Sequence, residues 1–490
     1  MIRFLLNQTL VSETGLDANL SVLDYLRRRQ GRMGAKEGCA SGDCGACTVV
    51  LVQAAGGKLR YDSINACITL IGALHGKQLL TVEDLSHQGQ LHGVQQAMVD
   101  NHASQCGFCT PGIVMSLFAL QKSAAGDTDD AITQALGGNL CRCTGYRPIM
   151  DAARQICRAV DDRFSDQENQ TLAQLAQLQQ QDDQPVSAPL SGPVDGAGVP
   201  ARPVSLRPRT LAQLGATFLR HPDARLLAGG TDLALAITLR RETLPLLIDI
   251  NHIPELKILS ATEKQLEIGA AASLSACEPF LARHLPEFRA ALTRFASRQV
   301  RNQATLGGNL ANASPVGDGA PMLLALDARL VLRRGDDARE LPLAQFFLSY
   351  RHTALAAGEF IERIIVPRVT ASHKCQFYKV AKRREDDISA VFAAFCCEIE
   401  GGVIRSARLA YGGMAEIPRR ATGAEGALLG QPWERKTVEL ACLRLADDFT
   451  PLSDLRAGGA YRLRVAQNLL RRFYLSASLP RHRLEVDHYV

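Results

Sequence analysis

The sequence predicts an α+β protein of several domains, and three observations support this prediction. The chain has 490 residues, 46% hydrophobic and 21% charged, a length typical of about three or four domains. Short strand-like runs surround one helix at the start, whereas residues 87 to 160 have helical periodicity. A Gln-rich and then Pro/Gly/Ser-rich stretch precedes a second α+β half. We therefore expect segments at residues 1–86, 87–164, 165–200, 201–370 and 371–490.

Charge and hydropathy argue against nucleic-acid and membrane partners. The 55 basic and 50 acidic side chains leave a net charge of +5, which is too balanced for nucleic-acid binding. No apolar run reaches the roughly 18 residues that a membrane helix needs. The N-terminus enters a strand-like run without the apolar region of a signal peptide. We therefore expect a cytoplasmic protein.

A first group of cysteines lies in a glycine-rich loop. Its spacing is C-x4-C-x2-C followed by a distant fourth cysteine, the plant-type [2Fe–2S] pattern in which four thiolates hold two irons. Zinc is the alternative ligand for four cysteines. A helix from Ser21 to Gln30, capped by Ser21, precedes the loop, and a hairpin turning at Gly56-Gly57 comes after it. The four expected ligands are Cys39, Cys44, Cys47 and Cys67.

A second group has the pattern C-x2-C and then C-x-C. Thr110 as N-cap and Pro111 as first helical residue predict a helix whose positive end faces these cysteines. The pattern indicates a second [2Fe–2S] cluster between helices, again with zinc as the alternative. The expected ligands are Cys106, Cys109, Cys141 and Cys143. The six remaining cysteines have no ligand spacing and are expected to be small buried apolar residues; they are Cys157, Cys277, Cys375, Cys396, Cys397 and Cys442.

Residues 165–200 are expected to be a flexible linker. Eight glutamines lie between residues 167 and 184, and Pro, Gly and Ser are frequent in residues 185–200. Such a composition buries too little apolar surface to fold. Leu172, Leu175 and Leu178 are spaced for a short helix, a signal on which this prediction does not depend.

Two glycine loops mark the second half. One runs from Leu226 to Leu233 after an apolar strand, and the other runs from Ala304 to Asp318. Neither has the GxGxxG spacing of a Rossmann fold. Glycines followed by Thr, Asn or Ser offer backbone N–H groups that can hold a pyrophosphate, although each loop taken alone favours an ordinary tight turn.

These motifs together resemble the xanthine dehydrogenase/aldehyde oxidase family of molybdenum hydroxylases. The runs Cys106-Gly-Phe-Cys109-Thr-Pro-Gly and Cys141-Arg-Cys143-Thr-Gly-Tyr resemble its second iron–sulfur domain, and residues 38–48 resemble its ferredoxin-like domain. The paired glycine loops resemble its FAD-binding domain. The resemblance implies four folded parts: a β-grasp ferredoxin domain, a helical-bundle [2Fe–2S] domain, an α+β FAD-binding domain of the vanillyl-alcohol-oxidase/PCMH type, and an α+β flavoprotein C-terminal domain.

The resemblance also implies which residues contact FAD. Phe295 would pack against the flavin ring, with an ordinary core position as the alternative. The charged loop within residues 377–389 would influence whether NAD⁺ or oxygen takes the electrons. The expected FAD contacts are Leu226, Leu227, Ala228, Gly229, Gly230, Thr231, Asp232, Leu233, Phe295, Ala296, Thr305, Gly308, Asn309, Asp318, Ile361 and Lys379.

The function implied by the resemblance is electron transfer. Because no stretch remains for a molybdenum-cofactor domain, we expect the small iron–sulfur/FAD subunit of an enzyme that oxidises hypoxanthine and xanthine to urate. A molybdopterin-binding large subunit would carry the catalytic residues, the two chains would assemble as a dimer of heterodimers, and NAD⁺ would be the acceptor. Electrons would pass from the second cluster to the first and then to FAD. The alternatives are a related subunit acting with a partner on aldehydes or N-heterocycles, and a non-catalytic zinc-binding scaffold.

Overall fold

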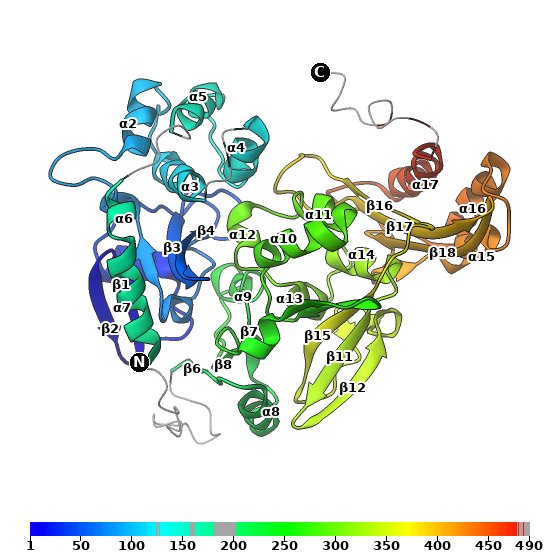
Figure 1. The fold of residues 1–490 in the computed structure, drawn as a ribbon, viewed down its shortest axis with the longest axis horizontal. Coiled ribbons are helices and arrows are strands. Elements are labelled where there is room, and N and C mark those ends of the chain that lie inside the picture. Colours follow the sequence, from blue (N-terminus) through cyan, green and yellow to red (C-terminus); the bar gives the residue numbers. More distant parts are fainter. Residues whose placement is uncertain are drawn as a thin grey trace. The chain divides into compact units, whose positions relative to one another are not determined.

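The chain folds into two compact units, whose helices and strands are labelled in Figure 1. The computed structural model describes residues 1–123, 126, 128–156, 162–180, 202–477, 479 and 484. Unit 1 comprises Met1–Arg209, Ala224–His252 and Ala296–Ala304, and unit 2 comprises Thr210–Asp223, Ile253–Phe295 and Thr305–Val490. Within the described residues, no helix has the length and hydrophobicity needed to cross a membrane.

Unit 1 begins with a five-stranded sheet in the order β2-β1-β5-β3-β4. Strands β1 and β5 are parallel, and the other neighbours are antiparallel. The predicted hairpin is formed by β3 and β4, with Gly56 and Gly57 both at positive φ in the turn. The strands are β1 (Ile2–Leu6), β2 (Thr9–Glu13), β3 (Thr48–Ala55), β4 (Lys58–Asn65) and β5 (Gln78–Leu80).

Short helical turns complete this sheet. The Ser21 hydroxyl accepts a hydrogen bond from the Asp24 backbone at 3.0 Å, as expected of an N-cap. The expected single helix is divided, because α1 continues as a π-helical turn rather than as further α-helix. The turns are α1 (Val22–Asp24), η1 (Tyr25–Arg29), η2 (Ile71–Leu74) and η3 (Val82–Asp84).

The helical part of unit 1 is organised around α3 (Thr110–Lys122). Every residue from Gly112 to Leu120 is buried, because α3 contacts α2 (Gly93–Asp100), α4 (Asp129–Leu136), α5 (Arg147–Ile156) and strands β3 and β4 (Figure 1). The predicted cap at Thr110 is wrong by one residue. Cys109 is the N-cap and makes no side-chain capping bond, since the Thr110 hydroxyl pairs with Ser104 instead.

The first part of the expected linker is helical. Residues Arg163–Asp166 form α6, and Glu168–Gln180 form α7. Leu175 and Leu178 are buried in a cluster with Leu5, with Leu59 packed against it. The prediction of a flexible segment is therefore wrong for this part, because the leucines at helical spacing form an apolar face that packs against the sheet. The rest of the expected linker, residues 181–200, lies outside the described residues.

The end of the first segment of unit 1 and the two segments that return to it complete this unit. They form a parallel sheet in the order β6-β8-β7 and two short helices. Leu227, Ala234 and Leu247 from these segments share one apolar core with Phe4 and Leu26 from the N-terminal sheet. The elements are β6 (Val204–Leu206), β7 (Arg225–Leu227), α9 (Ala234–Thr238), β8 (Leu246–Asp249) and α12 (Arg298–Arg301).

The first part of unit 2 is an antiparallel sheet in the order β12-β11-β15-β10-β9. A short β13–β14 pair accompanies it. The strands are β9 (Leu259–Ala261), β10 (Gln265–Gly269), β11 (Arg329–Arg334), β12 (Asp337–Pro342), β13 (Phe347–Ser349), β14 (His352–Thr353) and β15 (Glu359–Pro367). The helices are α8 (Leu211–Arg220), η4 (Pro254–Lys257), α10 (Leu274–His284), α11 (Pro286–Leu292), α13 (Leu306–Ala311), α14 (Gly319–Ala325) and η5 (Leu343–Gln345).

The second part of unit 2 is an antiparallel sheet in the order β16-β17-β18-β19. Three helices pack with it around Phe395, Tyr411 and Phe473. The elements are β16 (His373–Val380), β17 (Val391–Glu400), β18 (Val403–Gly412), β19 (Arg419–Arg420), α15 (Thr422–Leu428), α16 (Arg435–Asp448) and α17 (Gly459–Leu475). Mixed sheets and helices in both units confirm the predicted α+β class.

The cysteines outside the two groups have different environments. Cys277, Cys397 and Cys442 are buried, as expected. The expectation is wrong for Cys375 and Cys396, which form a disulfide because they lie directly opposite each other in the β16–β17 register. Cys157 lies outside the described residues.

Candidate functional site

The first cysteine group converges in the loop before β3. The Sγ atoms of Cys47 and Cys67 are 3.3 Å apart, and both residues are buried. The loop turns sharply because Ala40, Gly42 and Gly45 adopt positive φ. A Cβ on Gly38 would lie 2.8 Å from the Cys44 sulfur. Glycine at position 38 therefore leaves room for that thiol.

Backbone N–H groups point at the Cys39 sulfur. Those of Ser41 and Cys44 are 3.5 and 3.3 Å from it. The Cys44 and Cys67 thiols also hydrogen bond to Cys39 and, with Ser41, hold its pKa well below the ordinary value. Because bonds of this kind stabilise a negative sulfur, the loop is suited to thiolate ligands.

The second cysteine group lies at the N-terminal end of α3. Cys106 and Cys143 are exposed, whereas Cys141 is buried. The Cys141 backbone donates to the Tyr146 hydroxyl at 2.8 Å, and the Cys141 sulfur lies 3.1 Å from the Thr144 hydroxyl. Burial raises the pKa of Cys109 to about 12. A metal that binds this thiol must displace its proton, which makes binding pH-dependent.

Both groups offer four thiols in contacting pairs. In the second group, Cys106 is hydrogen bonded to Cys143 and Cys109 to Cys141. Within the described part of the chain, no set of three or more His, Cys, Asp or Glu side chains surrounds a single ion position. A [2Fe–2S] cluster takes two thiolates on each of its two irons. The residues present therefore fit one such cluster in each group.

The two cysteine loops touch each other. The Leu140 backbone N–H donates to the Cys44 carbonyl at 3.0 Å. Leu140 directly precedes the expected ligand Cys141, and Cys44 is itself an expected ligand of the first group. A Cβ on Gly45 would lie 2.2 Å from the Gly138 carbonyl oxygen, and a Cβ on Gly112 would lie 2.1 Å from the Gly45 carbonyl oxygen. Only residues without side chains allow the loops to approach this closely.

The first glycine loop, which contains eight expected FAD contacts, belongs to unit 1. Leu226 and Leu227 end β7, and the loop continues to Leu233 before α9. A Cβ on Gly229 would lie 2.1 Å from the Gln303 carbonyl oxygen, and Gly230 has positive φ. The Asn251 amide donates to the Ala228 carbonyl at 2.6 Å. These contacts hold the loop in a turn whose backbone N–H groups and Thr231 hydroxyl suit a pyrophosphate.

Asn251 supports this loop, although the sequence pattern did not single it out. Its amide also donates to Asp249 at 2.8 Å. Burial acts to raise the pKa of Asp249, but the hydrogen bond from His252 and those from Asn251 lower it overall. The signal available in the sequence was the polar run Asp249-Ile-Asn251-His252 at the carboxyl end of a parallel strand, where ligand-binding groups gather in α/β sheets.

The second glycine loop and its expected contacts belong to unit 2. The Thr305 hydroxyl caps α13 by accepting from Gly308 at 3.0 Å, and the Asn309 side chain accepts from Gly319 at 3.2 Å. The buried Asp318 carboxylate accepts from Lys379 at 2.8 Å and from the Ser389 hydroxyl at 2.6 Å. The structure therefore links Thr305 to Gly308 and Asp318 to Lys379.

The remaining expected contacts are more dispersed. Ile361 is buried in β15, Phe295 is half-buried after α11, and Ala296 has a positive φ of 45°. The loop at residues 226–233 belongs to unit 1, and the other glycine loop belongs to unit 2. Each glycine loop by itself offers the backbone N–H groups and hydroxyls that can hold part of an FAD dinucleotide.

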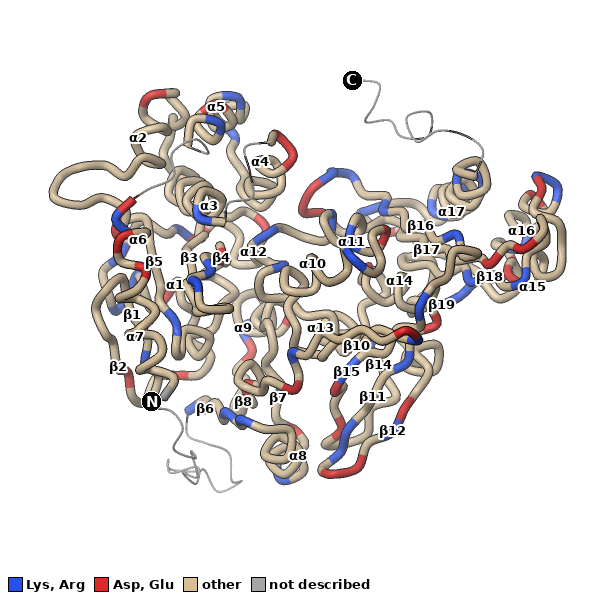
Figure 2. The backbone as a smooth tube through the Cα atoms, in the orientation of Figure 1, with Lys and Arg blue, Asp and Glu red and all other residues tan. Residues whose placement is uncertain are grey.

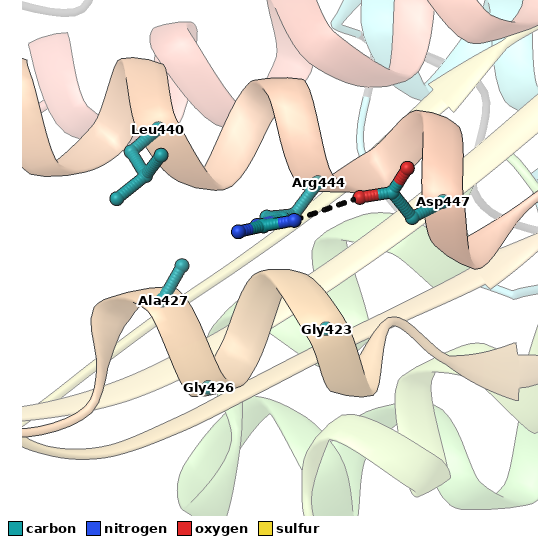
Figure 3. A pocket seen from close by; sticks show the side chains of 6 residues that line it. All are labelled: Gly423, Gly426, Ala427, Leu440, Arg444 and Asp447. Atoms are coloured by element: carbon teal, nitrogen blue, oxygen red, sulfur yellow. Dashed lines mark hydrogen bonds and ion pairs between the residues drawn. The ribbon is translucent and has the colours of Figure 1, made fainter.

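Unit 2 carries two other surface features. A groove of about 500 Å³ lies between α15 and α16, where Leu440 faces Ala427 and Arg444 pairs with Asp447 (Figure 3). The residues that line this groove are not among the expected FAD contacts. The loop after β16 carries charges of both signs (Figure 2), and Arg383 there bonds to Asp387 and to the Asp386 carbonyl.

Comparison with known proteins identifies four families along the chain. The family described as 2Fe-2S iron-sulfur cluster binding domain matches residues 9–72, and the [2Fe-2S] binding domain matches residues 81–154. The FAD binding domain in molybdopterin dehydrogenase matches residues 201–369, and the CO dehydrogenase flavoprotein C-terminal domain matches residues 376–477.

Similar proteins cover nearly the whole chain. Xanthine dehydrogenase of Emericella nidulans is 35% identical over 96% of this chain, and xanthine dehydrogenase/oxidase of Mus musculus is 32% identical over 96% of it. The chain spans only 38% of each of these proteins. A carbon monoxide dehydrogenase structure from Hydrogenophaga pseudoflava matches with 30% identity and a TM-score of 0.53, covering 56% of this chain and 96% of that one. Quinoline 2-oxidoreductase from Pseudomonas putida 86 matches with 27% identity and a TM-score of 0.52, covering 57% and 97%.

The fold, the cysteine groups and these similarities define an iron–sulfur flavoprotein with two [2Fe–2S] domains and an FAD-binding domain. The chain is homologous to the N-terminal part of xanthine dehydrogenase. The chain belongs to the molybdenum hydroxylase family.

Proposed function

We propose that the chain is the electron-transferring iron–sulfur/FAD subunit of a cytoplasmic xanthine dehydrogenase. A large partner subunit that binds molybdopterin would oxidise hypoxanthine and xanthine to urate. The second cysteine group receives the electrons, the first group passes them on, and they leave through FAD to NAD⁺. Two copies of each chain form the complete enzyme.

One observation carries this proposal: both cysteine groups lie in one compact unit, and their loops are joined by the bond from Leu140 to Cys44. Two one-electron centres that are connected in this way are suited to passing electrons from one to the other rather than to storing them separately. FAD supplies the conversion between single electrons and a hydride. The exposure of Cys106 and Cys143 supports the placement of the second group at the entrance, where a partner can approach.

The residues of the cofactor sites are part of the proposal. The eight cysteines of the two groups are the iron ligands. The loop at residues 226–233 holds the adenine dinucleotide, and Phe295, Ala296, Ile361 and the polar residues from Thr305 to Lys379 contact the rest of FAD. The segments at residues 1–86, 87–164, 201–370 and 371–490 are the proposed functional domains.

The purified chain tests the proposal directly. We expect iron–sulfur and flavin absorption and about four irons per chain, two for each four-cysteine site. NADH should reduce an artificial dye through the isolated chain, whereas xanthine should be oxidised only when a molybdopterin-binding partner is present. A colourless protein with stoichiometric zinc would refute the iron–sulfur sites, and xanthine oxidation by the chain alone would refute the subunit assignment.

A second candidate is the same type of subunit in an enzyme for N-heterocycles or aldehydes. The structural similarity to quinoline 2-oxidoreductase favours it, although the identity to xanthine dehydrogenase is higher, at 35% against 27%. Substrate turnover by the complex with its partner separates the two: reduction by quinoline or an aldehyde but not by xanthine would support the second candidate.

A further inference from the structure

One short segment of the flavin-binding region is built into the iron–sulfur unit. Residues 296–304 lie within the match to the FAD-binding family but belong to unit 1. We call them the crossing segment. Its helix α12 is capped by the Ser297 hydroxyl, which accepts from Val300 at 3.3 Å. The Asn302 amide donates to the Ser63 carbonyl at 2.8 Å, and the Thr69 hydroxyl donates to Gln303 at 2.9 Å, so the segment is fixed to the ferredoxin-like sheet.

The side chain of Gln299 extends from this segment to a junction between the two cysteine loops. It is fully buried, with 0% of its surface exposed. Its amide nitrogen donates to Asn139 at 2.9 Å and to Ser116 at 3.1 Å, and lies 3.5 Å from the Thr48 hydroxyl. Thr48 directly follows the expected ligand Cys47, and Asn139 is two residues before the expected ligand Cys141. One amide therefore contacts both loops.

Gln299 also holds Asn139 in the orientation that joins the loops. Asn139 accepts from Gln299 on its oxygen and donates from its nitrogen to the Gly45 carbonyl at 3.0 Å. A Cβ on Gly138 would lie 2.4 Å from the Gln299 side-chain oxygen, so the backbone before Leu140 rests on this amide. The bond from Leu140 to the Cys44 carbonyl depends on that backbone position.

Loss of the amide has consequences beyond a single bond. Asn139, Ser116 and Thr48 are all buried, and water has no access to replace a lost donor. The Ser116 hydroxyl would still donate to Asn139 at 2.7 Å and the Asn139 amide to Thr48 at 3.3 Å, but each of these oxygens would lose the donor that connects it to the crossing segment. Buried polar networks of this kind fix a single arrangement when complete and permit several when broken.

We propose that Gln299 is a positioning residue that sets the placement of one cysteine group relative to the other. It thereby controls the coupling between the two centres from within the flavin-binding region. This inference rests on the proposed function, because it requires a [2Fe–2S] cluster in each group. It predicts that Gln299 affects a property of the pair of clusters and leaves the content of each cluster intact.

Electron paramagnetic resonance of the reduced holoprotein measures that property. Two nearby paramagnetic centres split each other's signals, and the splitting varies steeply with their separation. We expect Gln299→Met, which keeps the length but removes the amide, to retain iron and flavin while changing the splitting. Transfer between the clusters should also slow, because its rate falls as the distance between the two centres grows.

Two further variants make the test decisive. Gln303→Met lies on the same segment but loses only the bond from Thr69, and we expect it to keep the wild-type splitting. Ser116→Ala removes one acceptor of the Gln299 amide and also the hydroxyl that donates to Asn139 at 2.7 Å, with a minimal change of volume, and we expect a change in the same direction as Gln299→Met. It serves as the main variant if Gln299→Met does not accumulate as folded protein.

The outcomes separate this inference from the proposed function. A wild-type protein without two distinct cluster signals would refute the iron–sulfur sites themselves. Two intact clusters with the same splitting in wild type, Gln299→Met and Ser116→Ala would refute the role of Gln299 only. An equal change in Gln303→Met would also overturn it, since the effect would then reflect general loosening of the crossing segment.

Discussion

Replacement of Gly112 by alanine sets two effects of opposite sign against each other. Gly112 lies in the first turn of α3, and alanine in a helix is favoured over glycine by about 0.8–1.0 kcal/mol. The new Cβ would lie 2.1 Å from the Gly45 carbonyl oxygen, 3.1 Å from its carbonyl carbon and 3.3 Å from the Ala46 Cα. These are backbone atoms that no rotamer change can move. Overpacking of this kind costs about 1–3 kcal/mol, so after the gain in helix propensity we expect a net destabilisation of up to about 2 kcal/mol.

The assay is thermal loss of iron–sulfur absorption in the holoprotein, together with iron per chain before heating. Gly112→Ala should lose its colour at a lower temperature than wild type and contain less iron, because α3 and the first cysteine loop must separate. Gly93→Ala is the matched control, since its Cβ would meet nothing within 4 Å at the start of α2 in the same unit. A Gly112→Ala protein with full iron and unchanged or higher thermal stability would refute the close approach of the two loops.

Three further predictions concern stability. Burial acts to raise the pKa of Asp162, but hydrogen bonds from His92 and Lys122 hold it well below the ordinary value. The ionised Asp162 therefore stabilises the folded state above about pH 4, and this contribution to the free energy of unfolding is lost as the pH falls. Asp162→Asn should cost about 3 kcal/mol in urea unfolding at pH 7 and less in acid, and an equal loss at both pH values would contradict this pairing. Leu175→Ala should cost about 2–5 kcal/mol and make α7 sensitive to proteases, whereas unchanged digestion would show that α7 does not pack on the sheet. Gly426→Ala, where a Cβ meets nothing within 4 Å, should stabilise α15 by up to about 1 kcal/mol, and a lower melting temperature of unit 2 would count against an open groove there.

Local patterns in the sequence predicted much of the fold. The hairpin of β3 and β4 followed from a continuous apolar run and a Gly-Gly turn. Leu463, Ala466, Leu470 and Phe473 at helical spacing predict a closing helix from Ala460 to Tyr474. The structure has this helix as α17, one residue longer at each end. The α+β class followed from the change of periodicity near residue 87. These features depend on near neighbours in the chain, which is why periodicity identifies them.

Features that depend on distant residues were missed. The leucines of α7 pack on Leu5 and Leu59. The composition of residues 165–200 gives no information about which distant residues lie beside them in the fold. The disulfide between Cys375 and Cys396 depends on the register of two strands, and register is set by pairing rather than by either strand alone.

The candidate site shows the same division. The cysteine spacings led to two groups of thiols that converge, because ligand spacing is a local property. The bond between Gln299 and Asn139 joins residues separated by 160 positions, and a lone glutamine in a polar run carries no local sign of burial. Asn251 lay in a visible polar run, but its role depends on how β7 and β8 align.

The threading of the chain through unit 1 also constrains its synthesis. The core that contains Phe4 and Leu26 includes Leu227 and Leu247, with Val300 packed against it. The last segment of unit 1 ends at Ala304, so the ribosome must add about 95 residues after Arg209 before this core can be completed. At about 5–20 residues per second, the ribosome needs roughly 5–20 seconds to add them. During that interval the nascent iron–sulfur half presents an incomplete apolar surface, and the junction beneath Gln299 is still open. Insertion of iron and sulfide by assembly factors would then have a window while the polypeptide is being made, before the crossing segment closes over the two loops.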